Sequence, residues 1–98
     1  PRLTNLKPND PEQFFNTIVK NITLLYKKEL THGDLSAFNI LNHNEKPVFI
    51  DFSQTTTMQN SIFHDLFVRD VTTVVNHFNK LGLSLTASKV INTIKTSK

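Results

Sequence analysis

The first third of the chain carries an apolar pattern with the period of an α-helix. Asp10 offers a side-chain acceptor for a helix start, and Pro11 suits the first helical position. We therefore predict a helix that begins at Pro11 and ends near Glu29 or Leu30, after an extended lead-in over residues 1–9. Its buried face consists of apolar residues at steps of four, four and three: Phe14, Ile18, Ile22 and Leu25.

Between Asn39 and Asp51 the pattern changes to two short apolar runs. Residues 40–42 and 48–50 form these runs, and residues 43–47 between them have the chemistry of a turn. The pattern predicts a β-hairpin that is apolar on both faces and therefore largely buried. If its register pairs residue 40 with 50 and 42 with 48, Asn39 and Asp51 form the next pair at the open end.

Helical spacing returns after a polar stretch at residues 55–60, which we expect to be a loop. A second helix is predicted over residues 63–81, with Gly82 where a helix C-terminus favours glycine. A last helix, capped by Ser84 or Thr86, completes an α+β, mainly helical fold. The apolar positions of these two helices are Phe63, Leu66, Phe67, Val71, Val74, Val75, Phe78, Leu81, Val90, Ile91 and Ile94.

The open end of the predicted hairpin brings together side chains that suit a divalent cation. Directly opposed residues have Cβ atoms about 4.5–5.5 Å apart, so the Asn39 amide oxygen and the Asp51 carboxylate can share one ion. Mg²⁺ prefers such oxygen ligands and takes its remaining ligands from phosphates and water. Asp34 precedes Asn39 by five positions, and its carboxylate is suited to orient or deprotonate an incoming hydroxyl group.

Each of these three side chains also has an ordinary structural interpretation. Asp34 could cap a local turn, Asn39 could begin a strand and Asp51 could end one. Their combination, with His32 and Gly33 directly before Asp34, favours the chemical interpretation. The spacing reproduces the protein-kinase catalytic loop, in which an Asp acts as base and an Asn holds magnesium, followed after a hairpin by a second magnesium-binding Asp.

The composition is that of one small folded domain. The chain has 98 residues, 38% of them hydrophobic, with eight Phe and no Cys, which excludes disulfides and thiolate metal sites. Its net charge of +3 comes from dispersed lysines, so direct nucleic-acid binding by this segment alone is not expected. No apolar run approaches a membrane span and the start is not a signal peptide, so we expect a soluble, cytoplasmic chain.

Four strings of the sequence resemble the RIO family of atypical protein kinases, specifically its C-terminal lobe: "HGDLSAFN", "IDFSQ", "LFVRDV" and "NHFNKLGL". The resemblance implies that Asp34 is the catalytic aspartate, that Asn39 and Asp51 are magnesium ligands, and that Ser36 belongs to the cofactor-binding set. Members of the family are also thought to form a phosphoaspartate, which would be at Asp51 here. The chain departs from the family at Ala37, where Glu is usual, and at residues 60–61, where His-Pro is common.

By resemblance, the cofactors are ATP and Mg²⁺, and the partner is the pre-ribosomal small subunit, whose maturation the family serves. A Gly-rich loop and a strand Lys that would clamp the nucleotide are not found in residues 1–98, so we interpret these residues as a partial domain that lacks the N-terminal lobe. We expect the chain to have negligible kinase or ATPase activity by itself.

Two alternatives remain open at the level of the sequence. Small-molecule phosphotransferases of the aminoglycoside and choline kinase type share the His-Gly-Asp loop, but tend to follow it with a Gly-Asp-Pro element that is missing here. A non-catalytic interaction module could also have kept the motif. Ordinary protein kinases fit less well, because Gly33 stands in place of their loop Arg and no Ala-Pro-Glu signature follows.

Three further residues have competing interpretations. We expect His32 to support the loop by hydrogen bonding, because no other His has metal-ligand spacing with it. Arg69 and Asp70 are expected to open the helix after the metal-binding segment. There Asp70 would interact with the helix dipole alone, or else Arg69 or Asp70 would make a buried pairing with the loop that carries Asp34.

Overall fold

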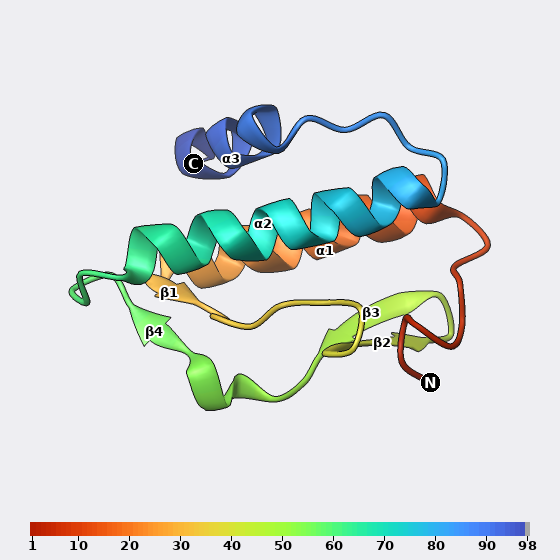
Figure 1. The fold of residues 1–98 in the computed structure, drawn as a ribbon, viewed down its shortest axis with the longest axis horizontal. Helices are drawn as coiled ribbons and strands as arrows, with labels where there is room; N and C mark the ends of the chain where they lie inside the picture. Colours follow the sequence, from red (N-terminus) through yellow and green to blue (C-terminus); the bar gives the residue numbers. More distant parts are fainter. Residues whose placement is uncertain (98) are drawn as a thin grey trace.

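The long helices of the chain pack side by side and in opposite directions (Figure 1). They are α1 (Pro11–Lys27) and α2 (Phe63–Lys80) of a computed structural model that describes residues 1–97. A shorter helix, α3 (Ala87–Thr96), lies against both of them, on the side away from the strands. Within residues 1–97 no helix is long and apolar enough to cross a membrane.

Aromatic rings hold α1 and α2 together at both ends. Phe14 and Phe15, near the start of α1, have ring centroids 6.0 and 5.4 Å from that of Phe78 near the end of α2. At the other end the ring centroids of Tyr26 and Phe67 are 4.8 Å apart. Aromatic pairs at these separations stabilise beyond the area that they bury. The predicted helix faces are thereby confirmed; their buried members are Phe14, Ile18, Ile22, Phe63, Phe67, Val71, Val74, Val75, Phe78 and Ile94.

The start of α1 is confirmed and its end falls slightly early. Asp10 accepts a hydrogen bond from the Gln13 amide at 3.1 Å, and Pro11 is the first helical residue. The helix ends at Lys27 because Glu29 adopts a left-handed backbone conformation, with a φ of 61°. This residue turns the chain into β1 (Leu30–Thr31).

Two short antiparallel sheets lie along one side of the helices. β1 pairs with β4 (Thr56–Thr57), and β2 (Ile40–His43) pairs with β3 (Lys46–Phe49). The prediction of a loop over residues 55–60 is therefore wrong at Thr56 and Thr57. A strand of two residues is too short to show alternation in the sequence.

The hairpin exists, but its register differs from the predicted one by one residue. Ile40 pairs with Phe49 and His43 with Lys46. Asn44 and Glu45 form the turn between them, with φ values of 51° and 65°. Two successive left-handed residues make the tight turn whose twist matches a hairpin, whereas the predicted register requires an odd number of turn residues.

The corrected register changes what lies at the open end of the hairpin. The Ile50 amide donates to the Asn39 carbonyl oxygen at 2.9 Å, so Asn39 lies opposite Ile50 and not opposite Asp51. The expectation of a hairpin buried on both faces is also wrong, because Val48 is 42% exposed. The hairpin packs on the helices through one face and leaves the other to solvent.

The last turn of α2 ends as predicted. Gly82 has a φ of 107° and donates to the Asn79 carbonyl oxygen, and Leu83 donates to that of Phe78. These two bonds form the Schellman motif that commonly ends a helix at glycine. Thr86 occupies the N-cap position of α3, although its side chain makes no capping hydrogen bond.

Candidate active site

The predicted site residues lie on two loops, residues 32–39 and 50–55. These loops run between the same pair of sheets (Figure 1). The 32–39 loop joins β1 to β2 and carries Asp34 and Asn39; the 50–55 loop joins β3 to β4 and carries Asp51. Because β1 pairs with β4 and β2 with β3, the two loops are held side by side at both ends. Asp34, Asn39 and Asp51 are therefore on adjacent segments, although Asn39 and Asp51 are not the directly opposed pair that the sequence predicted.

Asp34 and Asn39 contact each other directly. The Asn39 side-chain nitrogen donates to the Asp34 carbonyl oxygen at 2.8 Å and to its carboxylate oxygen Oδ2 at 3.3 Å. Because both acceptors belong to Asp34, the nitrogen of the Asn39 amide faces Asp34 and its oxygen faces away. Within residues 1–97 that oxygen accepts no hydrogen bond and could bind a cation, while the nitrogen holds the Asp34 carboxylate.

Asp51 is placed at a sharp turn of the 50–55 loop. Its backbone is left-handed, with φ 60° and ψ 69°, directly before the 3₁₀ turn Phe52–Gln54. Asp tolerates this conformation better than most residues, although it still stores some strain. The Asp51 carboxylate is exposed and accepts a hydrogen bond from the Ser53 hydroxyl through Oδ1 at 2.8 Å, while Oδ2 receives none from residues 1–97.

The backbone of the 32–39 loop is held by one buried carboxylate, Asp70, which is 2% exposed. Asp70 Oδ2 accepts from the Thr31 hydroxyl at 2.8 Å and from the Gly33 amide at 2.8 Å, and Oδ1 accepts from the Leu35 amide at 3.0 Å. These bonds confirm the interpretation that pairs Asp70 with the loop. The expectation that Asp70 opens its helix is wrong, because α2 begins at Phe63 and Asp70 lies in its interior.

Gly33 contacts the Arg69 side chain and the Gln54 backbone. The Arg69 guanidinium donates to its carbonyl oxygen at 2.8 Å. Gly33 has a φ of 90°, and a Cβ atom added there would overlap the backbone oxygen of Gln54. Only glycine allows the 32–39 and 50–55 loops to approach so closely at this point.

His32 supports both loops, as predicted. The ring is 1% exposed, and its Nε2 donates to the Ile50 carbonyl oxygen at 2.7 Å. Its Nδ1 accepts from the Asp34 amide at 3.2 Å. Since one ring nitrogen donates and the other accepts, the hydrogen bonds fit a neutral imidazole that joins the Asp34 backbone to the segment just before Asp51.

Ser36 lies on the same loop but not against Asp51. Its hydroxyl oxygen accepts from the Phe38 amide at 3.2 Å, and its carbonyl oxygen accepts from the Asn39 amide at 3.0 Å. Its predicted cofactor-binding role stays a prediction. Thr31 is a supporting residue that the sequence analysis missed, because a single Thr in a strand of two residues carries no distinctive pattern.

The donor set fits a partial magnesium site. Residues 1–97 contain no group of three or more His, Asp or Glu side chains that could hold a metal. An ion bound here would use the Asn39 amide oxygen and the Asp51 carboxylate, both of them hard oxygen ligands. Mg²⁺ commonly binds to one or two protein ligands and completes its shell with phosphates and water.

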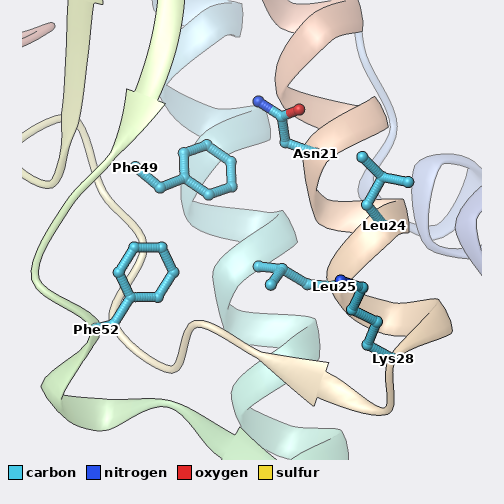
Figure 2. A pocket seen from close by; sticks show the side chains of 6 residues that line it. All are labelled: Asn21, Leu24, Leu25, Lys28, Phe49 and Phe52. Atoms are coloured by element: carbon cyan, nitrogen blue, oxygen red, sulfur yellow. The ribbon is translucent and has the colours of Figure 1, made fainter.

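An apolar pocket of about 270 Å³ lies beside the 50–55 loop. Figure 2 shows Phe49 and Phe52 on one side of it and Leu24 and Leu25 of α1 on the other. Leu24 is 53% exposed and Phe52 is 47% exposed. None of the four predicted site residues (Asp34, Ser36, Asn39 and Asp51) lines this pocket, so it is a separate surface next to the site.

Comparison with known proteins finds one family and several kinases to which the chain is similar. Residues 1–91 match the RIO domain family. The chain is 41% identical over 81 residues to the RIO-type serine/threonine-protein kinase Rio1 of Methanocaldococcus jannaschii, an alignment that covers 82% of this chain and 28% of the relative. The serine/threonine-protein kinase RIO1 of Saccharomyces cerevisiae is 33% identical over 79 residues, 80% of this chain and 16% of its own length.

A third relative, the RIO-type serine/threonine-protein kinase Rio1 of Thermoplasma acidophilum, is 30% identical over 84 residues, 86% of this chain and 45% of its own length. The chain thus spans less than half the length of each of these three relatives.

Proposed function

The chain belongs to the RIO domain family, and on that premise we propose that it supplies the catalytic residues of an ATP- and magnesium-dependent serine/threonine kinase or ATPase. The relatives carry the name RIO-type serine/threonine-protein kinase. In this proposal the chain corresponds to the C-terminal lobe of a protein-kinase-like fold. The observation that carries the proposal is the pair of hydrogen bonds from Asn39 to Asp34, on a loop whose backbone is held by the buried Asp70 carboxylate.

Asp34 acts on the hydroxyl group that receives the phosphoryl group. Its carboxylate is exposed, so a substrate can reach it, while the Asn39 amide holds one of its oxygens. The other oxygen accepts the hydroxyl proton and orients the acceptor oxygen for attack. Such positioning by a general base typically contributes about 10²–10⁴-fold to the rate.

Asn39 and Asp51 would hold the metal. A bound Mg²⁺ would supply positive charge that offsets the negative charge developing during phosphoryl transfer. The Asn39 oxygen is directed away from Asp34 by the two bonds of its nitrogen, and Asp51 keeps Oδ2 clear of hydrogen bonds from residues 1–97. With these two oxygens not used in hydrogen bonds within residues 1–97, Asn39 and Asp51 could act together as ligands of one ion.

Asp51 has a second role in the ATPase version of the proposal. An exposed carboxylate oxygen can accept the phosphoryl group of ATP, with ADP as the leaving group, and water then hydrolyses the acyl phosphate. The Ser53 hydroxyl, which binds the other Asp51 oxygen, steadies the carboxylate for attack.

The whole protein is expected to add a nucleotide-clamping lobe over the site. The apolar pocket between Phe52 and Leu24 is the surface that we expect this lobe to cover, because both side chains are about half exposed here. Without that lobe the phosphates of ATP are not positioned, so the 98-residue chain has negligible turnover alone. By family resemblance, we assign the whole protein to maturation of the small ribosomal subunit in the cytoplasm.

The magnesium dependence of ATP turnover by the full-length protein tests the metal assignment. We expect Asn39→Ala and Asp51→Asn to raise the Mg²⁺ concentration for half-maximal turnover by at least about tenfold, the scale seen even for supporting residues of metal sites. Asp65→Asn, an exposed carboxylate in the first turn of α2, is the matched control. An unchanged Mg²⁺ requirement in both site variants would show that the metal binds elsewhere.

A further inference from the structure

A second cavity, of about 340 Å³, opens on the other side of the 32–39 loop. It lies between residues 36–38, the C-terminal half of α2 and the lead-in segment. Its volume is at the small end of ligand pockets, roughly 300–1,000 Å³, and suits a group of side-chain size. The residues around it are Thr4, Ser36, Ala37, Phe38, Thr73, Asn76, His77 and Lys80.

The lining of this cavity is mixed, with more apolar than polar surface, and it carries no negative charge. Three hydroxyl groups and the amide of Asn76 can donate hydrogen bonds, and Lys80 adds an ammonium group. Among the described residues that line it there is no carboxylate. Ala37 occupies the centre of the loop wall with only a methyl group, so nothing on that wall repels an anion.

His77 is a neutral partner in this cavity. Burial lowers the pKa of its imidazole, and the positive charge of Lys80 lowers it further. At neutral pH the ring is therefore uncharged and offers one donor and one acceptor. The positive charge of the lining thus comes from Lys80.

The cavity lies close to Asp34 along the chain. Ser36 and Phe38 follow Asp34 by two and four positions, so their Cα atoms lie within about 8 and 15 Å of the Asp34 Cα atom. An extended substrate advances about 3.4 Å per residue. Because these distances are upper limits, a group bound beside Ser36 or Phe38 is at most about four residues of an extended substrate away from a hydroxyl group held at Asp34.

We propose that this cavity is a substrate subsite that binds an acidic or phosphorylated side chain close in sequence to the acceptor residue of a protein substrate. Lys80 pairs with the anion, and the hydroxyl and amide groups around it complete the hydrogen bonds. The proposal rests on the kinase function proposed above and adds the chemical class of its substrate.

A protein side chain fits this cavity better than a nucleic acid does. Proteins that bind a phosphate backbone neutralise several phosphates in a row with several Lys or Arg residues. Here the described lining contains Lys80 alone as a cation, and the cavity accommodates one anionic group. A single phosphate or carboxylate on a peptide satisfies this arrangement.

The first test compares peptide substrates of the full-length protein. One peptide set carries Asp or phosphoserine at each position two to four residues from the acceptor Ser, and its partner set carries Ala there. We expect a higher kcat/KM for the anionic peptides. Lys80→Ala should reduce this preference about tenfold, because a hydrogen bond to a charged group contributes on that scale.

Matched variants separate the subsite from general charge effects. Lys89→Ala removes the same charge from an exposed position of α3 and should keep the preference. Lys80→Glu and Ala37→Glu place a carboxylate in the cavity and should abolish it. The subsite is overturned if the wild type shows no preference for anionic peptides, or if Lys80→Ala and Lys89→Ala show the same preference. If the protein still transfers the phosphoryl group in that case, the proposed function is not affected.

The second test does not require catalysis. A phosphoserine peptide is titrated into the ¹⁵N-labelled full-length protein, and its unphosphorylated form serves as control. The subsite predicts shifts at Thr73, Asn76, His77 and Lys80 that Lys80→Ala removes. Shifts elsewhere, or none, overturn the subsite even if no peptide is phosphorylated. Stronger shifts of the same residues by a short single-stranded RNA would assign the cavity to nucleic acid instead.

Discussion

At the scale of single residues, the buried carboxylate of Asp70 organises the loop that carries Asp34. It accepts three hydrogen bonds from Thr31, Gly33 and Leu35, so the backbone on both sides of the loop start is fixed from one point. Asp34 itself remains exposed. The chain thus separates the group that holds the loop from the group proposed to do chemistry.

We expect Asp70→Asn to lower the free energy of unfolding by about 3 kcal/mol. One carboxylate oxygen becomes an NH₂ group that cannot accept, which leaves at least one buried donor of the loop without a partner at a cost of about 1–3 kcal/mol each. Urea unfolding measures the change, and Asp65→Asn, exposed in the same helix, is the control. Equal stability of the two variants would contradict the role given to Asp70.

Gly33→Ala should destabilise the chain more than Gly82→Ala does. Both glycines have positive φ values, 90° and 107°, so both alanine variants take up backbone strain of roughly 1 kcal/mol. The Cβ atom at position 33 also meets the Gln54 backbone, whereas at position 82 nothing lies near it. Thermal unfolding of both variants compares the costs. Equal losses would mean that the two loops do not pack closely at Gly33.

At the scale of elements, the helices could be predicted from the sequence and the hairpin only in part. The helix period over Phe14 to Leu25 and over Phe63 to Phe78 follows directly from burial of one face. The hairpin register depends on a turn whose residues, Asn44 and Glu45, are both left-handed. Since Glu rarely adopts a left-handed backbone conformation, the sequence does not indicate a two-residue turn.

The turn is stabilised by a side chain that the sequence analysis counted as part of an apolar run. Asn42 is buried; its Oδ1 accepts from the Glu45 amide at 2.9 Å, and its Nδ2 donates to the Leu6 carbonyl oxygen at 3.2 Å. Glu45 in turn accepts from the Asn9 amide at 2.7 Å. The lead-in segment is thereby tied to the hairpin.

Asn42→Ala should lower the free energy of unfolding by about 2 kcal/mol, because it removes two hydrogen bonds that the buried Asn42 side chain makes to the Glu45 amide and the Leu6 carbonyl oxygen. Amide hydrogen exchange should also speed up at Leu3 and Glu45 relative to α2. Asn92→Ala, at an exposed position of α3, should leave both quantities unchanged. Protection of Leu3 that is the same in both variants would contradict the proposed tie.

The residues of the candidate site and the support by His32 could be proposed from the sequence, but the support by Thr31 could not, and that by Asp70 only as one of two options. Asp34, Asn39 and Asp51 follow from spacing along one segment. Asp70 is 36 positions after Asp34, and its contact with the loop arises only when α2 packs under β1. Sequence reasoning raised this contact as one of two options, and only the packing of the helices decides between them.

At the scale of the whole molecule, the pH dependence of stability should carry a contribution from His77. Its folded-state pKa is lowered by burial and by Lys80, so between that value and the ordinary pKa of about 6.5 the unfolded chain binds a proton that the folded chain does not. The contribution of this group is fully present above the ordinary pKa. It is lost as the pH falls toward the lowered one.

His77→Gln should therefore lose less stability than the wild type when the pH falls from about 7.5 to about 5. Urea unfolding at both pH values gives the comparison, and each protein serves as its own reference at pH 7.5. A parallel loss in the two proteins would show that His77 is not the group that titrates.

The fold as a whole is a small α+β domain of three helices and short antiparallel strands within residues 1–97. Its two sheets hold the 32–39 and 50–55 loops side by side, and α1 and α2 pack against one side of these sheets. The chain matches the RIO domain over residues 1–91 but spans only 28% of its relative from Methanocaldococcus jannaschii. Activity is therefore best measured on the full-length protein.

The most direct test of the central claim is the rate of phosphoryl transfer from ATP by the full-length protein carrying Asp34→Asn. The account predicts a loss of at least about 100-fold, with ATP affinity retained, because Asp34 acts on the acceptor hydroxyl and not on the nucleotide. Asp65→Asn should retain the wild-type rate. A rate in Asp34→Asn close to that of Asp65→Asn would contradict the account.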